Sequence, residues 1–295
     1  MLTKWKAWRR TLYIGTRRCS ALARQMAYER SRYGLVGAMF MMTLAVRAGE
    51  SKSVFIEDFT WPELKEAIAT GANSVLVFSG SVEETGPYVI LGKHNYRAHA
   101  YADRIARELG RTLVGPIIPA VPVSGGLARY PGTIDVPADI YSSYTAAIVR
   151  AMASAGFKHV FLLGDHGGSQ KPLEDLAPQL DKSLSPKGTR VYFVGDGYAK
   201  ATSEIVALEK ARGLAADGHG GLWDTAETWA ANPLGVRPSL FVAAGPVSHP
   251  GGIDANGIQG DSRPATPELG REFAEIRIRE AAAEIRTLLA GENHP

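Results

Sequence analysis

Cysteine is nearly missing from this chain, and its scarcity excludes several kinds of chemistry. The only cysteine among the 295 residues is Cys19, in a basic N-terminal stretch that we expect to be removed. The remaining chain can form no disulfide and offers neither a thiolate metal ligand nor a cysteine nucleophile. Any metal ion must therefore be bound by histidine, aspartate or glutamate.

Three common catalytic signatures are also missing. The sequence has no P-loop, no G-x-G-x-x-G after a strand and no G-x-S-x-G elbow. The formal net charge is +3, but residues 1–48 hold ten basic residues and one acidic residue, so the rest of the chain has a net charge of −6. We therefore expect no binding to nucleic acid.

The N-terminal region has the features of a secretory signal. The uncharged segment Gly34–Val46 is too short for an ordinary membrane span. Basic residues precede it, and Val46 and Ala48 fit the small-residue pattern of a cleavage site. This predicts a signal peptide over residues 1–48, and a single domain over 49–295 that is periplasmic or secreted and has no membrane span. An amphipathic or buried helix is the alternative for this segment.

Apolar strand patterns alternate with helix patterns along the rest of the chain. Strand patterns occur at 74–80, 112–123, 159–168 and 190–198, and helix patterns at 61–71, 95–110, 139–157, 172–184 and 266–291. This alternation predicts an α/β fold, with a three-layer α/β/α arrangement around a mainly parallel sheet. Ligands of such folds bind outside the carboxyl ends of the strands. We therefore expect segments 80–95, 164–170 and 195–198 to converge with the glycine-rich loop 217–225.

Two of these segments carry an acidic residue, a histidine and paired glycines. Asp165 and His166 follow an apolar strand, and His219 and Asp224 lie in "DGHGGLWDT". A histidine placed this way can ligate a metal ion while a neighbouring carboxylate fixes its tautomer. A histidine in a polar turn is the alternative, and Trp223 either walls an apolar pocket or belongs to the core.

The segment "FSGSVEETGPYVILGKHN" combines adjacent carboxylates with a histidine. Glu83 and Glu84 point to different sides of an extended backbone, so at most one faces the site. His94 and His99 are about 140° apart on a helix, so we do not expect them to ligate the same ion. Three other histidines are not assigned to the site either. His159 and His294 are expected to be structural or solvated, and His249 is undecided.

The same motifs resemble the signature of the creatininase (creatinine amidohydrolase) family. "GSVEETGPYVILGKHN" is similar to the family's Gly-Ser-x-Glu-Gln-His-Gly-Pro-His-x-Pro-Leu-Gly-Thr-Asp. "YPGTIDV" resembles its Phe-Pro-Gly-Thr, "GDHGGSQ" its Asn-Gly-His-Gly-Gly-Asn, and "HGGLWDTA" its His-Ala-Gly-Glu-x-Glu-Thr-Ser. The likeness runs in order over about residues 55–285, through the family-like ending "GIQGDSRPATPELGREF".

The resemblance implies a metal-dependent hydrolase of amide bonds, often cyclic ones, that assembles into a homo-oligomer, commonly a hexamer. Carried over by position, Glu83 and His166 are metal ligands, and His219 is the catalytic histidine alongside Glu83. Asp224 replaces a glutamate and can still donate an oxygen ligand. One or two divalent ions per chain are expected, of zinc, manganese or iron. We expect the substrate to be a small-molecule amide.

This chain departs from the family's pattern at three positions. Thr85 replaces a histidine that binds the second metal, His94 replaces a bridging aspartate, and Tyr88 replaces the histidine after Gly-Pro. A site of Glu83, His94 and His166, with or without Asp224, is still complete for one ion. "GKHN" resembles a divergent branch that often carries signal peptides.

These observations favour an amidohydrolase whose water is activated by the metal ion. We expect Tyr88, Trp223 and Asp165 to contact the substrate. The alternative is a catalytically inactive relative that binds a small molecule, because the positions of Thr85 and His94 are altered.

Overall fold

The computed structural model describes residues 53–124, 126–214, 218–246 and 252–292. These residues belong to the unit Ser51–Pro295. The helices are α2 (Trp61–Ala69), α3 (Lys93–Leu109), α4 (Ala138–Ala155), α5 (Gly167–Leu184), α6 (Ala199–Ala211), α7 (Leu222–Ala231) and α8 (Pro267–Gly291). The strands are β1 (Ser74–Ser79), β2 (Thr112–Val114), β3 (His159–Gly164) and β4 (Arg190–Phe193). Short 3-10 turns lie at Ile56–Asp58, Leu127–Arg129, Ser185–Lys187 and Pro238–Leu240.

The four strands form one parallel sheet in the order β2-β1-β3-β4. The two central strands, β1 and β3, are buried almost throughout and apolar at their middle residues, as expected where both faces of a sheet are covered. Their register pairs Ser79 with Gly164, so both strands end at the same level. The residues that follow them therefore emerge side by side at one edge of the sheet.

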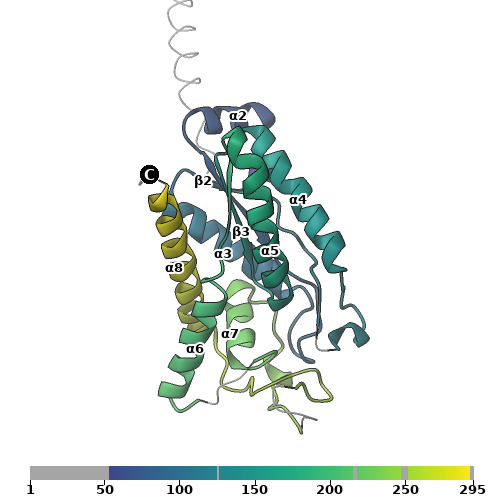
Figure 1. The fold of residues 1–295 in the computed structure, drawn as a ribbon. Helices are drawn as coiled ribbons and strands as arrows, with labels where there is room; N and C mark the ends of the chain where they lie inside the picture. The colour runs from purple at the N-terminus through teal and green to yellow at the C-terminus, as the bar shows by residue number, and fades with distance from the viewer. Residues whose placement is uncertain (1–52, 125, 215–217, 247–251, 293–295) are drawn as a thin grey trace, which may run out of the picture. The chain divides into compact units, whose positions relative to one another are not determined.

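Alternate side chains of β1 point into two separate cores. Val75 and Val77 pack with residues of α4 and α5, such as Val149 and Leu180. Leu76 and Phe78 lie in the second core, with residues of α3 and α8. Figure 1 shows α4 and α5 on one side of the sheet and α3 and α8 on the other. The predicted three-layer α/β/α fold is confirmed.

The predicted helix boundaries are mostly close to the observed ones. Helix α2 begins at Trp61 with a capping box between Thr60 and Glu63 and a proline in its first turn. Helix α3 begins at Lys93, two residues before the predicted start, so His94 lies on a helix and not in the segment before it.

Two helices were not predicted, and one of them corrects the interpretation of loop 217–225. The segment Leu222–Thr225 is the first turn of α7, and only residues 218–221 of the described part of that loop are non-helical. Every residue from Leu222 to Thr228 is buried, the polar ones included, so this part of α7 has no solvent-exposed face. A buried helix lacks the amphipathic period from which helices are usually inferred. The other missed helix, α6, packs against α8.

The predicted signal peptide, residues 1–48, lies outside the described residues, and so do His249 and His294. Among the described residues, none of the helices combines the length and the apolar character that crossing a membrane requires. The periplasmic or secreted location stays a prediction.

Candidate metal centre

Glu83 reaches the site from the segment that follows β1. The Glu83 N–H donates to the Leu91 carbonyl oxygen at 2.9 Å, which closes the chain between them into a turn. A Cβ on Gly80 would lie 2.9 Å from the backbone of Asn95, so glycine allows the end of β1 to approach the start of α3. The Glu83 carboxylate is fully buried beside the first turn of α3.

His94 lies in that first turn and joins two carboxylates. Its Nδ1 donates to Asp165 Oδ2 at 2.6 Å, and its Nε2 is 2.7 Å from Glu83 Oε1. Asp165 follows β3 directly, so the parallel register of β1 and β3 brings the two acids to the same histidine. The Asp165 contact fixes the ring and directs Nε2 at Glu83, as the outer carboxylate of a metal-binding histidine does.

His166 is the N-cap residue of α5 and faces the other oxygen of Glu83. Its Nε2 lies 2.7 Å from Glu83 Oε2, and its Nδ1 accepts a hydrogen bond from the Gly168 N–H at 3.0 Å. A Cβ on Gly168 would overlap the Pro122 carbonyl oxygen, so the second glycine of the motif permits this close packing. The His94 and His166 rings are 4.9 Å apart and nearly perpendicular.

These three residues can hold a divalent ion. Glu83, His94 and His166 each offer a ligand atom, and the atoms lie within 4.8 Å of one another. Two imidazoles and one carboxylate form a ligand set suited to zinc, manganese or iron, with positions left for water. The Glu83 carboxylate is fully buried and faces both imidazoles, so it supplies the negative charge that a cation at this place requires. Since Nδ1 of His166 accepts a hydrogen bond from the Gly168 N–H, Nε2 carries the ring proton, and an ion bound there would displace it.

The charges around the site keep its acids ionised. Burial raises the pKa of Glu83, but the charges of His94 and Lys93 outweigh it and hold the pKa far below the usual range. Burial likewise opposes ionisation of Asp165, and the Arg97 charge and the His94 hydrogen bond lower its pKa. Burial lowers the pKa of His166, which favours the neutral form that ligates metals.

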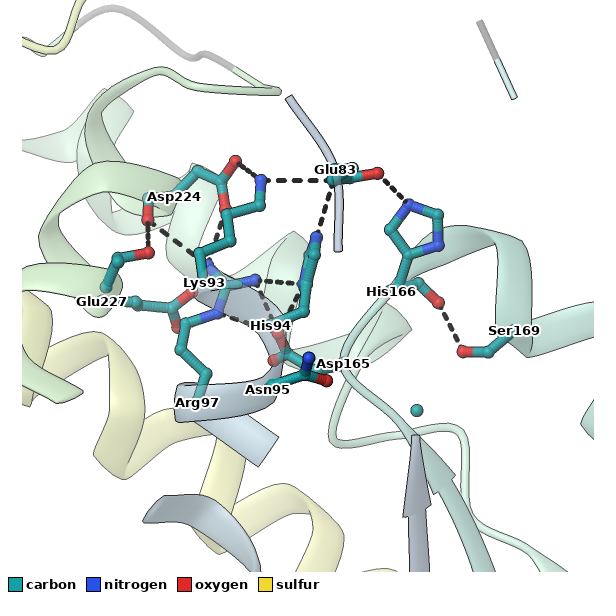
Figure 2. Close-up of polar contacts among 12 residues, drawn as sticks. Glu83, Lys93, His94, Asn95, Arg97, Asp165, His166, Ser169, Asp224 and Glu227 are labelled. Carbon is teal, nitrogen blue, oxygen red and sulfur yellow. Dashed lines mark hydrogen bonds and ion pairs between the residues drawn. The ribbon is translucent and has the colours of Figure 1, made fainter. Parts of the chain in front are cut away.

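A buried network of charged side chains supports the three residues from the side of α3 and α7. Figure 2 shows the Lys93 amine between Asp224 and Glu83, and the Arg97 guanidinium between Asp165 and Asp224. Lys93 Nζ is 3.4 Å from Glu83 Oε1 and contacts Asp224 Oδ2 directly.

Arg97 links the two carboxylates through separate guanidinium nitrogens. Nε and Nη2 lie 2.8 and 2.7 Å from Asp165 Oδ2, and Nη1 lies 2.6 Å from Asp224 Oδ1. Glu227 lies one helical turn after Asp224, 3.5 Å from Arg97 Nη1, and it also contacts Arg277. Burial raises the pKa of Glu227 despite both arginines.

Sequence reasoning did not select Lys93, Arg97 or Glu227. One signal was available. Lys93 and Arg97 are four residues apart, so both cations lie on one face of α3. Lys93 is also next to the predicted ligand His94 in the sequence. Asp224, which was predicted as a ligand, is not part of the three-residue group and contacts the two cations instead.

His219 lies beside this group and is partly open to solvent. Its Nε2 donates to the Glu84 carbonyl oxygen at 2.8 Å, while Nδ1 is 3.7 Å from Glu83 Oε1. The side chain is 19% exposed, whereas the Glu83 side chain is 0% exposed. His219 is therefore the member of the site that a ligand can approach from solvent.

The residues predicted to contact substrate are all buried. Tyr88 is 0% exposed, and its hydroxyl donates to the Gly220 carbonyl oxygen at 2.5 Å. Trp223 lies in a core of α6, α7 and α8 residues, with the Arg277 guanidinium 5.0 Å from its ring. Asp165 is held by His94 and Arg97. Their contact with substrate stays a prediction.

The remaining predicted positions lie outside the metal group. His99 stacks on Phe55 at 3.9 Å, away from His94, as the helical spacing indicates. His159 Nε2 is 3.0 Å from Glu292, which agrees with a structural role. Segment 195–198 packs beside the site, where Tyr198 and Asp165 line a cavity of about 10 Å³. Thr85 is fully buried.

Comparison with known proteins identifies the family. Residues 57–285 match the creatininase family model, described as creatinine amidohydrolase. The chain belongs to the creatininase family. Creatinine amidohydrolase of Pseudomonas putida is 27% identical over 120 residues, which cover 39% of this chain. The match spans 46% of that relative, less than half of its length.

Solved structures of creatininases share the fold. One described as "Creatininase Mn" has a TM-score of 0.68 and 21% identity, and the match covers 80% of this chain and 98% of that one. A glutamate-to-glutamine mutant creatininase described as "Zn-Zn type" has a TM-score of 0.68 and 22% identity, with the same coverage. The predicted creatininase-like fold is thus confirmed, and the family supports a divalent metal ion as cofactor.

Proposed function

We propose that this protein is a metal-dependent amidohydrolase that cleaves the carbon–nitrogen bond of a small amide, in particular a cyclic one. The observation that carries the proposal is the buried Glu83 carboxylate, whose two oxygens each lie 2.7 Å from an imidazole nitrogen. The partly exposed His219 beside it supplies a group for proton transfer. Membership of the creatininase family supports this reaction class.

Glu83, His94 and His166 would bind the ion in this mechanism. A zinc, manganese or iron ion held there would activate a water molecule and polarise the substrate carbonyl. Asp165 holds the His94 ring through Nδ1, and this contact keeps Nε2 directed at Glu83. Burial of His166 keeps its ring neutral and thus able to bind.

His219 is placed to move the proton. A carbonyl oxygen only accepts hydrogen bonds, so the contact with Glu84 assigns the ring proton to Nε2 and leaves a lone pair on Nδ1. That lone pair can take a proton from the attacking water and return it to the leaving nitrogen. Glu83, whose Oε1 is 3.7 Å away, is the nearest carboxylate to stabilise the imidazolium that forms.

Metal analysis tests the binding half of the proposal. The purified protein is treated with a chelator, reloaded with Zn²⁺ or Mn²⁺, freed of excess metal and measured by mass spectrometry. We expect a stoichiometric ion in the wild type and its loss in His94→Ala. His99→Ala is the matched control, since it removes a histidine from the same helix outside the site. Wild-type protein without bound ion would refute the proposal.

A substrate screen tests the catalytic half. Reloaded protein is incubated with a panel of cyclic amides and formamides, and products are detected by mass spectrometry. For any substrate found, His219→Ala should lower kcat by about 10²- to 10⁴-fold, the usual share of a general acid or base, without changing metal content. A metal-loaded protein that binds panel compounds but turns none over would favour the inactive small-molecule-binding alternative.

The oligomeric state is a separate proposal. We propose a homo-oligomer on the basis of the family resemblance, and size-exclusion chromatography with light scattering tests it.

A further inference from the structure

Lys93 is the most unusual buried side chain at the site. It is the first residue of α3, and its side chain is 1% exposed. A buried ammonium needs charged or hydrogen-bonding partners, because it has lost its water. Lys93 finds two, Glu83 Oε1 at 3.4 Å and Asp224 Oδ2 in direct contact.

These two acids are the donors that a second metal ion would require. Glu83 directs Oε2 at His166, whereas Oε1 faces both His94 Nε2, at 2.7 Å, and the Lys93 ammonium, at 3.4 Å. Asp224 is almost fully buried, and its Oδ2 also accepts the Gly220 N–H at 2.9 Å. The nearest remaining donor is Nδ1 of His219, 3.7 Å from Glu83 Oε1. A carboxylate pair with an imidazole nearby is a suitable set for a divalent cation, but the ammonium is already among them.

We propose that the Lys93 ammonium takes the place of a second metal ion, so that the centre holds one divalent ion and one fixed positive charge. This inference rests on the proposed function for the first ion, held by Glu83, His94 and His166. It assigns Asp224 as the counterion of Lys93 and Arg97, and not as a metal ligand. A divalent ion at this second position would be repelled by the ammonium and would have to displace it from both acids.

The arrangement gives Lys93 a positioning role. The ammonium lies on the side of Oε1 that faces away from His166 and orients the Glu83 carboxylate, whose two oxygens contact the two histidines. It also gives the site a cation that no chelator can remove. A mutant creatininase described as "Zn-Zn type" shares the fold. Its metal content can therefore be compared with the single ion proposed for this chain.

The test counts ions bound to the whole protein. Wild type, Lys93→Ala, Lys93→Arg and the double variant Lys93→Ala/Asp224→Ala are stripped with a chelator and titrated with Zn²⁺. Bound zinc per folded chain is then measured by mass spectrometry, after circular dichroism has confirmed folding. Asp224→Asn is measured as well, because it keeps the side chain's shape and removes its charge.

We expect one ion in the wild type and in Lys93→Arg, two in Lys93→Ala, and one again in the double variant. Asp224→Asn should retain one ion, and its zinc Kd should rise less than tenfold. Two ions in the wild type, or one in a folded Lys93→Ala, would overturn the inference. If Lys93→Ala does not fold, Asp224→Asn decides, and loss of its ion would overturn the assignment of Asp224. Zero ions in the wild type would instead refute the proposed function.

Discussion

Replacing Arg97 with methionine tests whether the buried charge network stabilises the fold. The Arg97 guanidinium is almost fully buried and contacts the carboxylates of Asp165 and Asp224 at 2.6 to 2.8 Å. Methionine fills a similar elongated space without charge. In Arg97→Met, both carboxylates stay buried, and only Asp224 keeps a lysine partner, Lys93.

The expected loss of stability follows from this imbalance. Removing one partner of a buried ion pair costs about 3–5 kcal/mol, because the remaining charge is left unpaired away from water. Two carboxylates lose a partner here, but Lys93 partly compensates one of them. We expect a loss of about 4 kcal/mol in the free energy of unfolding. With an m-value of about 3 kcal/mol/M, the urea midpoint should fall by roughly 1.3 M.

The assay is urea unfolding, followed by circular dichroism, with a chelator present so that metal binding does not contribute. Arg104→Met is the matched control. Arg104 lies on the same helix and pairs with Glu275, but the two side chains are 51% and 56% exposed. An exposed pair contributes about 1 kcal/mol or less. If Arg97→Met loses no more stability than Arg104→Met, the buried carboxylates of Asp165 and Asp224 do not need the arginine as a partner, and the reasoning fails.

Two further predictions concern the packing of α8 and a loop carboxylate. Gly270→Ala should lower the free energy of unfolding by about 1–3 kcal/mol in urea, because its Cβ would overlap the Ala226 carbonyl oxygen, whereas Gly291→Ala on the same helix has open space and should cost nothing. Burial opposes ionisation of Asp254, but hydrogen bonds from three backbone N–H groups lower its pKa, so its stabilising effect should be present above about pH 4 and disappear as the pH falls through the folded pKa. Urea unfolding of the wild type and Asp254→Asn should differ in free energy at pH 6, and the difference should become smaller as the pH is lowered below about 4; a difference that does not change with pH would contradict this.

The position of the metal group could be predicted because it follows from the sheet. Glu83 and His166 each come a few residues after an apolar strand, and parallel strands end at a common edge. The register of Ser79 with Gly164 then brings the two segments together. This prediction did not need the order of all the strands. It needed only that the strands before Glu83 and His166 are parallel and adjacent.

The charge network could not be predicted in the same way. A lysine and an arginine near the start of a helix usually face solvent, but Lys93 and Arg97 are buried against acids from α7 and from the segments after β1 and β3. The acids of α7, Asp224 and Glu227, follow more than 120 residues later, in a helix that could not be recognised because its polar residues are buried along with its apolar ones. Long-range packing, and not local pattern, decides whether these charges are buried.

Helix α7 therefore connects the stability of the fold to the site. Its contact with Gly270 of α8 is made through Ala226, between the site residues Asp224 and Glu227. A side chain at Gly270 would push against this part of α7, and the nearest parts to move are the two acids that hold Arg97. Because Arg97 orients Asp165, and Asp165 orients His94, the displacement would reach a proposed metal ligand through three direct contacts. Gly270, which lies in the family-like ending and outside the metal group, is therefore expected to influence the geometry of the centre.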